Sequence, residues 1–247
     1  MERAKKPPAK NNRPPPEWFF SKPGMKKMWK YISHFFYVAI NWNMWMAFFM
    51  LYDNIRGSIK YGSNTFIPVE LKNLTISSGD IKKASRYEAV SFYMLEQLFT
   101  AFRKISGEAS IIDLGCGKGR MMMVAAHYEF VNITGIDFAK EVCKEALANM
   151  KIKEKEFPEI KWEVINQNVE DYSIRSDDSV FFMFNPFKTQ VLKKFLEKLN
   201  ASCRQFPRTT YFIYASPQHQ QELLDNGYAI IYQKQKMYLK GIIAVRE

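Results

Sequence analysis

The sequence contains little cysteine and little histidine, which restricts the chemistry available to the chain. It has three cysteines and three histidines, at Cys116, Cys143, Cys203, His34, His127 and His219. The cysteines are odd in number, lie far apart and form no CxxC pair, which argues against a disulfide framework or a structural zinc site and favours a reducing compartment. The histidines are isolated and show no metal-ligand spacing. We therefore expect no metal in this protein.

Acidic residues are scarce at one end of the chain. The formal net charge is +11, and residues 1–30 carry nine Lys/Arg against two Glu, a net of +7. The rest of the chain carries only +4, so a nucleic-acid footprint over a whole domain is not indicated. Residues 1–24 are basic, rich in proline and poor in core-forming residues, which favours a disordered tail. Such a tail is also suited to touch an anionic surface, either lipid headgroups or nucleic acid.

A run without formal charge extends from Tyr31 to Leu51. Its 21 residues are long enough to span a bilayer, but Asn41 and Asn43 dilute its hydrophobicity. The preceding lysines would also keep the N-terminus inside and export the rest of the chain, away from the cytosolic cofactor inferred below. Three alternatives stay open, in falling order of preference: a helix packed on the domain or a second subunit, a helix on the bilayer surface, and a span. Residues 25–52 are thus a candidate contact with a membrane surface or an oligomer partner.

Beyond this run, a connector precedes an alternating pattern. Residues 52–80 are punctuated by Gly, Ser and Asn, so 25–80 is interpreted as an aromatic helix with a connector. From residue 81, short apolar runs alternate with amphipathic stretches, which is typical of βα units on a mainly parallel sheet. The expected strands are 110–114, 132–137, 161–166, 179–184, 209–216, 229–235 and 237–245, and the expected helices are 87–102, 120–129, 139–155, 189–203 and 217–227. The last two strands have no helix between them, which indicates one antiparallel strand.

The stretch IIDLGCGKGR ends the first expected strand and leads into the helix after it. Gly115, Gly117 and Gly119 let the backbone turn tightly and approach a ligand, but their spacing is not the GxGxxG of dinucleotide sites. Asp113 would repel a pyrophosphate and attract a cofactor with a positive amino acid end. Asp137 ends the second strand in TGID, where a carboxylate can bind both hydroxyls of a ribose. These residues favour a positively charged nucleoside over a phosphate-bearing cofactor.

DLGCGKGR together with GID resembles the nucleotide-binding half of class I S-adenosylmethionine-dependent methyltransferases, from about residue 86 to the C-terminus. The resemblance implies a three-layer αβα Rossmann-like fold over 81–247, with strand order 3-2-1-4-5-7-6 and an antiparallel seventh strand. It implies S-adenosyl-L-methionine as the cofactor. More narrowly, KYGSNT, RYEAV, the DLGCGKGR loop and FNPF look like a widespread group of bacterial methyltransferases.

The same resemblance implies further cofactor-binding residues. Cys116 and Phe138 neighbour the glycines and Asp137, and Tyr87 is expected near the methionine end. Asn168 and Val169 follow the third strand, where the family usually has an Asp beside the adenine amino group. An Asn can still accept that hydrogen bond through its carbonyl oxygen.

The fourth expected strand ends in FNPF. Ligands of an open α/β sheet bind beyond the strand ends where the strand order switches direction, so Asn185, Pro186 and Phe187 are expected to face the methyl group. The motif resembles the Asn/Asp-Pro-Pro-aromatic motif of amino-directed methyltransferases and the strand-4 loop of Rossmann-type histone lysine methyltransferases. Amide and backbone carbonyls there can accept an N–H from an acceptor amine and aim its lone pair for in-line displacement. A plain strand-ending turn is the alternative interpretation.

The favoured function is that of a cytoplasmic methyltransferase acting on a nitrogen of a protein side chain, a small molecule or a nucleobase. O-methylation is less favoured because no histidine is placed as an obvious base. Tyr61 and Thr65 are hypothesised to fold over the site as a lid. Lys118 and Arg120 are interpreted either as a solvated helix start or as an attraction for an anionic substrate. A membrane-associated cofactor-binding or scaffold protein without turnover is the alternative from another class.

Overall fold

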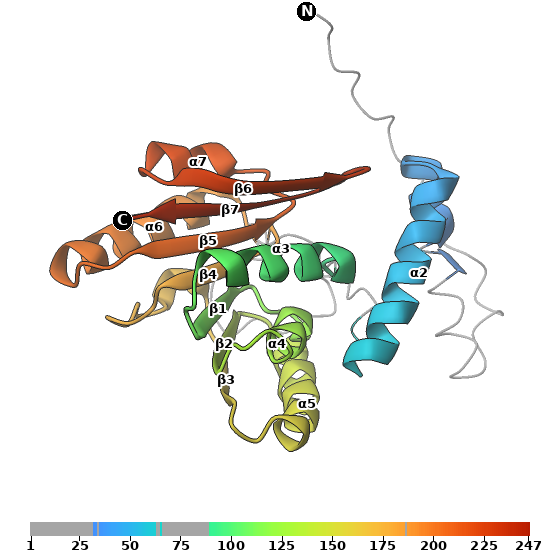
Figure 1. Ribbon diagram of the computed structural model, residues 1–247, viewed down its shortest axis with the longest axis horizontal. Coiled ribbons are helices and arrows are strands. Elements are labelled where there is room, and N and C mark those ends of the chain that lie inside the picture. Colours follow the sequence, from blue (N-terminus) through green and yellow to red (C-terminus); the bar gives the residue numbers. More distant parts are fainter. Residues whose placement is uncertain (1–31, 34, 63–64, 66–88, 186) are drawn as a thin grey trace, which may run out of the picture. The chain divides into compact units, whose positions relative to one another are not determined.

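The computed structural model describes residues 32–33, 35–62, 65, 89–185 and 187–247. The chain divides into two compact units, Met1–Ala47 and Phe48–Glu247. In the first unit, residues 32–33 and 35–41 are helical. The predicted tail over 1–24 lies outside the described residues. The sheet predicted from residue 81 onward lies entirely in the second unit (Figure 1).

Seven strands of the described chain form one sheet in the order β3-β2-β1-β4-β5-β7-β6. They are β1 (Ser110–Leu114), β2 (Asn132–Asp137), β3 (Lys161–Asn166), β4 (Val180–Met183), β5 (Thr210–Ala215), β6 (Ala229–Lys236) and β7 (Leu239–Arg246). Strands β1 to β5 pair in parallel, whereas β7 runs antiparallel to both β5 and β6. The predicted Rossmann-like methyltransferase fold is therefore confirmed, including its strand order and its antiparallel strand.

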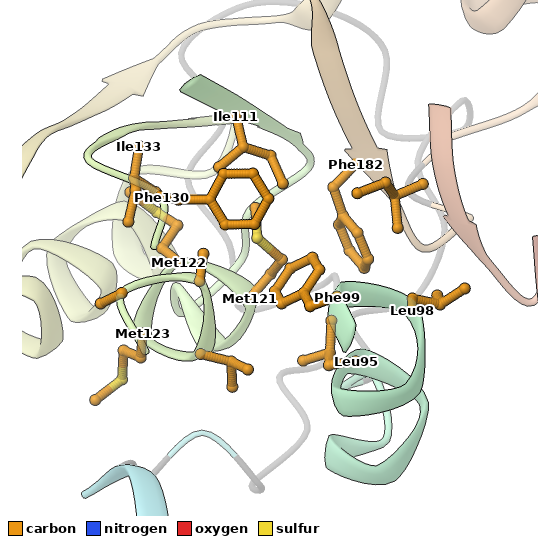
Figure 2. Close-up of a cluster of buried hydrophobic side chains, with 14 of the residues drawn as sticks. Leu95, Leu98, Phe99, Ile111, Met121, Met122, Met123, Phe130, Ile133 and Phe182 are labelled. Carbon is orange, nitrogen blue, oxygen red and sulfur yellow. The ribbon is translucent and has the colours of Figure 1, made fainter. Parts of the chain in front are cut away.

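Helices cover both faces of this sheet. In the second unit they are α3 (Phe92–Ile105), α4 (Arg120–Ala125), α5 (Lys140–Glu156), α6 (Thr189–Gln205), α7 (Gln220–Asp225) and the short 3-10 turn η4 (Val169–Asp171). Successive residues of a strand point to opposite faces, so Phe182 of β4 packs with α3, α4 and α5 while Phe181 packs with α6 and α7. Figure 2 shows part of the first cluster, where Phe99 lies beside Phe182. The core thus has two layers, one on each side of the sheet.

Helix α2 (Met44–Tyr61) differs from the expectation for the uncharged run. The run is interrupted at Trp42, and Asn43 caps the new helix because its Oδ1 accepts a hydrogen bond from the Met46 N–H at 2.7 Å. The prediction of a connector from residue 52 is wrong as far as Tyr61, because this stretch is helical. Within the described residues, no helix combines the length and the hydrophobicity that crossing a bilayer requires.

Candidate active site

The glycine loop directly follows β1 and is fastened to the end of β2. Gly115, Gly117 and Gly119 all have positive φ, at 85°, 52° and 77°, a region that other residues adopt only with strain. The N–H groups of Gly115 and Cys116 donate to the carbonyl oxygen of Ile136 at 2.8 and 2.9 Å. This pairing brings the turn after β1 against the last residues of β2, as the sequence predicts for a cofactor-binding loop.

Asp137 is the last residue of β2 and lies under the glycine loop. Its Oδ2 accepts a hydrogen bond from the Gly117 N–H, and its Oδ1 accepts one from the Ala139 N–H, both at 2.9 Å. The residue is 8% exposed. Burial raises the pKa of the Asp137 carboxyl to about 6, against the opposing effect of these backbone hydrogen bonds. Because an ionised carboxylate has about four acceptor positions, each oxygen can still accept a further hydrogen bond.

Asp113 adds a second buried carboxyl, on the neighbouring strand β1. The residue is 3% exposed. Burial, and then the nearby Asp137, raise the pKa of Asp113 well above its ordinary value. The same carboxyls, after burial itself, raise the pKa of the Cys116 thiol, which keeps the thiol neutral. A site that holds two such acids is stabilised by a ligand with positive charge and destabilised by a phosphate.

The end of β3 supplies asparagine side chains. Asn168 caps η4, because its Oδ1 accepts the Glu170 N–H at 3.0 Å, and its Nδ2 donates to Glu170 Oε2 at 3.2 Å. The next residue, Val169, is buried in the second core cluster. Asn166 was not singled out in the sequence, yet its Nδ2 donates to the carbonyl oxygen of Asp137 at 3.0 Å. Its register position opposite Asp137 on the paired strand is the signal that predicts this contact.

Beyond β4, the structure holds the side chain of Asn185 by both ends of its amide. Nδ2 donates to the carbonyl oxygen of Ser216 at 2.5 Å, and Oδ1 accepts from the Tyr214 hydroxyl at 2.7 Å. Asn185 and Ser216 both have positive φ, at 44° and 53°, which is a strained backbone for residues other than glycine. Tyr214 was not singled out in the sequence. The ends of β4 and β5 are therefore joined through one asparagine.

The remaining predicted site residues occupy different environments. Phe187 is 8% exposed and packs in the second core cluster, so its ring contacts other core side chains. Phe138 is half-buried directly after Asp137. Pro186 and Tyr87 lie outside the described residues. Among the residues that the structure does describe, no three His, Cys, Asp or Glu side chains are grouped so as to hold a metal ion.

The two cations of the glycine loop are buried. Lys118 is 5% exposed, and its ammonium pairs with Glu145 of α5 at 2.9 Å. Arg120 is 3% exposed, and it donates to Thr65 Oγ1 and to the Val90 carbonyl oxygen, both at 2.7 Å. The interpretation of these residues as a solvated helix start is wrong, because both side chains are buried and have polar partners inside the protein.

The two hypothesised lid residues have separate environments. Tyr61 is fully buried, stacks on Phe92 with 5.6 Å between ring centroids and donates to Glu96 at 2.7 Å, so it is a core residue rather than a lid. Thr65 is also fully buried, at the hydrogen bond from Arg120. Val90, two residues before α3, and Thr65 are thus both hydrogen-bonded to Arg120, the first residue of α4, immediately after the glycine loop.

The strand order, the left-handed glycine loop and the acids that end β1 and β2 are those of a Rossmann-like methyltransferase. Residues 105–245 match the methyltransferase domain family. This match covers more than half of the chain, and the chain belongs to that family. The predicted enzyme class, a methyltransferase, is confirmed.

Individual relatives are more distant. EEF1A lysine methyltransferase 2 of Homo sapiens is 37% identical over 62 residues, which cover 22% of this chain and 26% of that protein. The chain therefore matches about a quarter of the length of this curated relative. Solved structures that resemble the chain include magnesium protoporphyrin IX methyltransferase of Synechocystis PCC 6803 with bound S-adenosylmethionine. Its sequence identity to this chain is 15% and the TM-score is 0.49, and the match covers 63% of this chain and 79% of that one. A putative RNA methyltransferase of Pyrococcus horikoshii has 16% identity and a TM-score of 0.47, covering 71% and 93%.

Proposed function

We propose that the protein uses S-adenosyl-L-methionine to methylate a nitrogen by in-line displacement. The observation that carries this proposal is the pair of buried acids, Asp113 and Asp137, at the ends of two adjacent parallel strands. An environment that raises the pKa of both carboxyls favours a ligand that brings positive charge, as a sulfonium with an α-amino group does. Membership of a methyltransferase family supports the same cofactor.

Each part of the cofactor has a candidate set of residues. Asp113 is proposed to attract the amino group of the methionine end, and Asp137 to accept hydrogen bonds from the two ribose hydroxyls. The proposed contacts around them are the glycine loop residues Gly115, Cys116, Gly117 and Gly119, the methionine-end residue Tyr87, and the adenine-side residues Phe138, Asn168 and Val169. When bound, the cofactor supplies an electrophilic methyl group on sulfur.

Asn185 is proposed to orient the acceptor. Its Oδ1 accepts a hydrogen bond from the Tyr214 hydroxyl at 2.7 Å and a longer one from the Gln218 N–H at 3.4 Å, and its Nδ2 donates to Ser216. The backbone carbonyls of the FNPF loop, together with Oδ1 where the amine displaces the long Gln218 hydrogen bond, are proposed to receive the N–H groups of the amine and to aim its lone pair. Positive charge that develops on the nitrogen is stabilised by the same dipoles. Tyr214 and Ser216 keep these dipoles in a fixed direction, which lowers the reorganisation needed during reaction.

A protein side chain is the favoured acceptor class, ahead of a small molecule and a nucleobase. The sequence match to human EEF1A lysine methyltransferase 2 supports a protein substrate. Outside residues 1–30 the chain carries only +4, which gives little support to a nucleic acid.

Two experiments test the proposal. Isothermal titration calorimetry should detect binding of S-adenosylmethionine and S-adenosylhomocysteine but not of NAD; binding of NAD alone would overturn the cofactor assignment. Incubation with methyl-labelled S-adenosylmethionine and fractionated lysate should place label in protein. Label confined to nucleic acid or small molecules would reject the acceptor class, and cofactor binding without label in any fraction would reject turnover.

A further inference from the structure

Helix α2 has an exposed apolar face within the second unit of the chain. Phe48, Tyr52, Ile55 and Ile59 are 54%, 64%, 53% and 79% exposed. They follow one another at intervals of four, three and four residues, so they lie on one side of the helix. We call these four residues the α2 apolar face. Four large apolar side chains gathered on one helix are a recognised sign of an interaction surface.

The opposite side of α2 already fixes the helix to the domain. Gly57 lies against Phe92 of α3 so closely that a Cβ atom would stand 2.1 Å from its ring. Asp53 accepts hydrogen bonds from the Ser91 hydroxyl at 2.8 Å and from the Tyr93 N–H at 2.9 Å. Arg56 forms an ion pair with Glu96 at 2.8 Å. These contacts hold α2 against α3 from the side of the helix away from Tyr52, Ile55 and Ile59.

A second exposed apolar element lies beside this helix. The ammonium of Lys236, at the end of β6, stands 4.7 Å from the ring centroid of Phe49 on α2 and 4.4 Å from that of Tyr93. The two residues that follow, Met237 and Tyr238, form the turn to β7 and are 45% and 58% exposed. The β6–β7 turn therefore places two further exposed apolar side chains near α2.

We propose that the α2 apolar face, with the Met237–Tyr238 turn, docks the protein on an anionic lipid surface. The composition fits a bilayer interface, because tyrosine places an apolar ring in the lipid and a hydroxyl in the headgroup region. Stable binding to a membrane surface usually needs apolar burial and basic charge together. Residues 1–30 supply a net +7 in the sequence before α2. A second copy of the chain is a poorer occupant, since two chains of +11 repel each other.

Vesicle flotation of the full chain tests this proposal independently of catalysis. The protein should float with vesicles that contain phosphatidylglycerol and remain in solution with pure phosphatidylcholine. Raising the salt from about 0.1 M to about 1 M shortens the Debye length from roughly 10 to 3 Å, so binding should weaken. The absence of flotation with anionic vesicles at low salt would overturn the proposal.

A pair of matched substitutions tests whether the α2 apolar face is the surface that binds the vesicles. Ile55 on α2 and Ile152 on α5 are 53% and 54% exposed, so replacing either with Glu makes the same chemical change at the same exposure. Ile55→Glu should reduce partitioning about tenfold, the effect of losing roughly 1.4 kcal/mol of apolar burial, while Ile152→Glu should leave it unchanged. Thermal unfolding of both variants should match that of the unchanged protein.

Three results would reject the α2 surface. Binding that survives Ile55→Glu would assign the affinity to the basic segment alone. An equal loss in both variants would assign it to net charge. If light scattering finds a dimer that Ile55→Glu dissociates, the occupant is a second copy of the chain rather than a lipid surface.

Discussion

Replacing Asp137 with Asn tests the electrostatic basis of the proposed cofactor site. Asp137 is 8% exposed, and burial raises the pKa of its carboxyl to about 6. Below this pKa the carboxyl is protonated, and a protonated carboxyl is a weaker acceptor for the ribose hydroxyls. With a pKa of about 6, the Asp137 carboxyl is ionised in about nine-tenths of the unliganded molecules at pH 7 and in about one-tenth at pH 5. The apparent Kd for S-adenosylmethionine should therefore rise roughly tenfold as the pH falls from about 7 to about 5.

Asp137→Asn should weaken binding at pH 7 and reduce this pH dependence. Hydrogen bonds to a charged group contribute about 1.5–3 kcal/mol, so the loss of charge should raise the Kd about ten- to hundredfold. Asn keeps one acceptor oxygen, which preserves one of the hydrogen bonds from Gly117 and Ala139. Isothermal titration calorimetry at pH 5 and pH 7 measures both effects, and circular dichroism checks that the variant is folded.

Asp178→Asn is the matched control. Asp178 is 5% exposed, and burial raises the pKa of its carboxyl. It accepts hydrogen bonds from the Tyr172 hydroxyl and the Arg175 N–H. It lies just before the amino end of β4, whereas the candidate site lies beyond the carboxyl ends of the strands. This variant should bind the cofactor normally and keep the pH dependence. If Asp137→Asn binds as tightly as the unchanged protein at pH 7, Asp137 does not contact the cofactor.

Two further substitutions test the acceptor loop and the core beneath the glycine loop. Asn185→Ala removes the amide that joins Tyr214 to the end of β4. Calorimetry should find the cofactor Kd unchanged, while the rate of label transfer to lysate should fall about tenfold or more, which is a rise of at least about 1.4 kcal/mol in the activation free energy. Transfer at an equal rate would mean that the loop is purely structural. Gly135→Ala would place a Cβ atom 2.4 Å from the sulfur of Met122 and should lower the free energy of unfolding by about 1–3 kcal/mol in urea titrations. The control Gly107→Ala adds its methyl to open space, and a loss as large as that of Gly135→Ala would contradict the packing argument.

The sequence predicts the sheet in detail because its strands are short apolar runs with clear ends. β1, β2 and β3 begin and end where the sequence predicts. The glycine loop and the acids at the strand ends also indicate the family, and the resemblance to that family implies the strand order. The register of a parallel sheet then places Asp113, Asp137, Asn168 and Asn185 at the same edge.

Helix α2 shows where local signals fail. Gly57 and its polar neighbours favour a connector, since glycine weakens a helix interior. In the folded protein the ring of Phe92 occupies the space that a Cβ atom at Gly57 would need, so glycine is required there for close packing. Residues far apart in the sequence decide this point, and a pattern read along one segment does not contain it.

The sequence by itself determined the strand pattern, the glycine loop and the chemical type of the residues at the strand ends. Only the tertiary structure decided which partners those side chains have. Asp137 accepts a hydrogen bond from the glycine loop, Asn185 accepts one from Tyr214 of β5, and Arg120 donates one to Thr65. The physical reason is that periodicity and turn chemistry act between near neighbours in the chain. The partner of a buried polar group is instead set by whichever distant strand or helix packs against it.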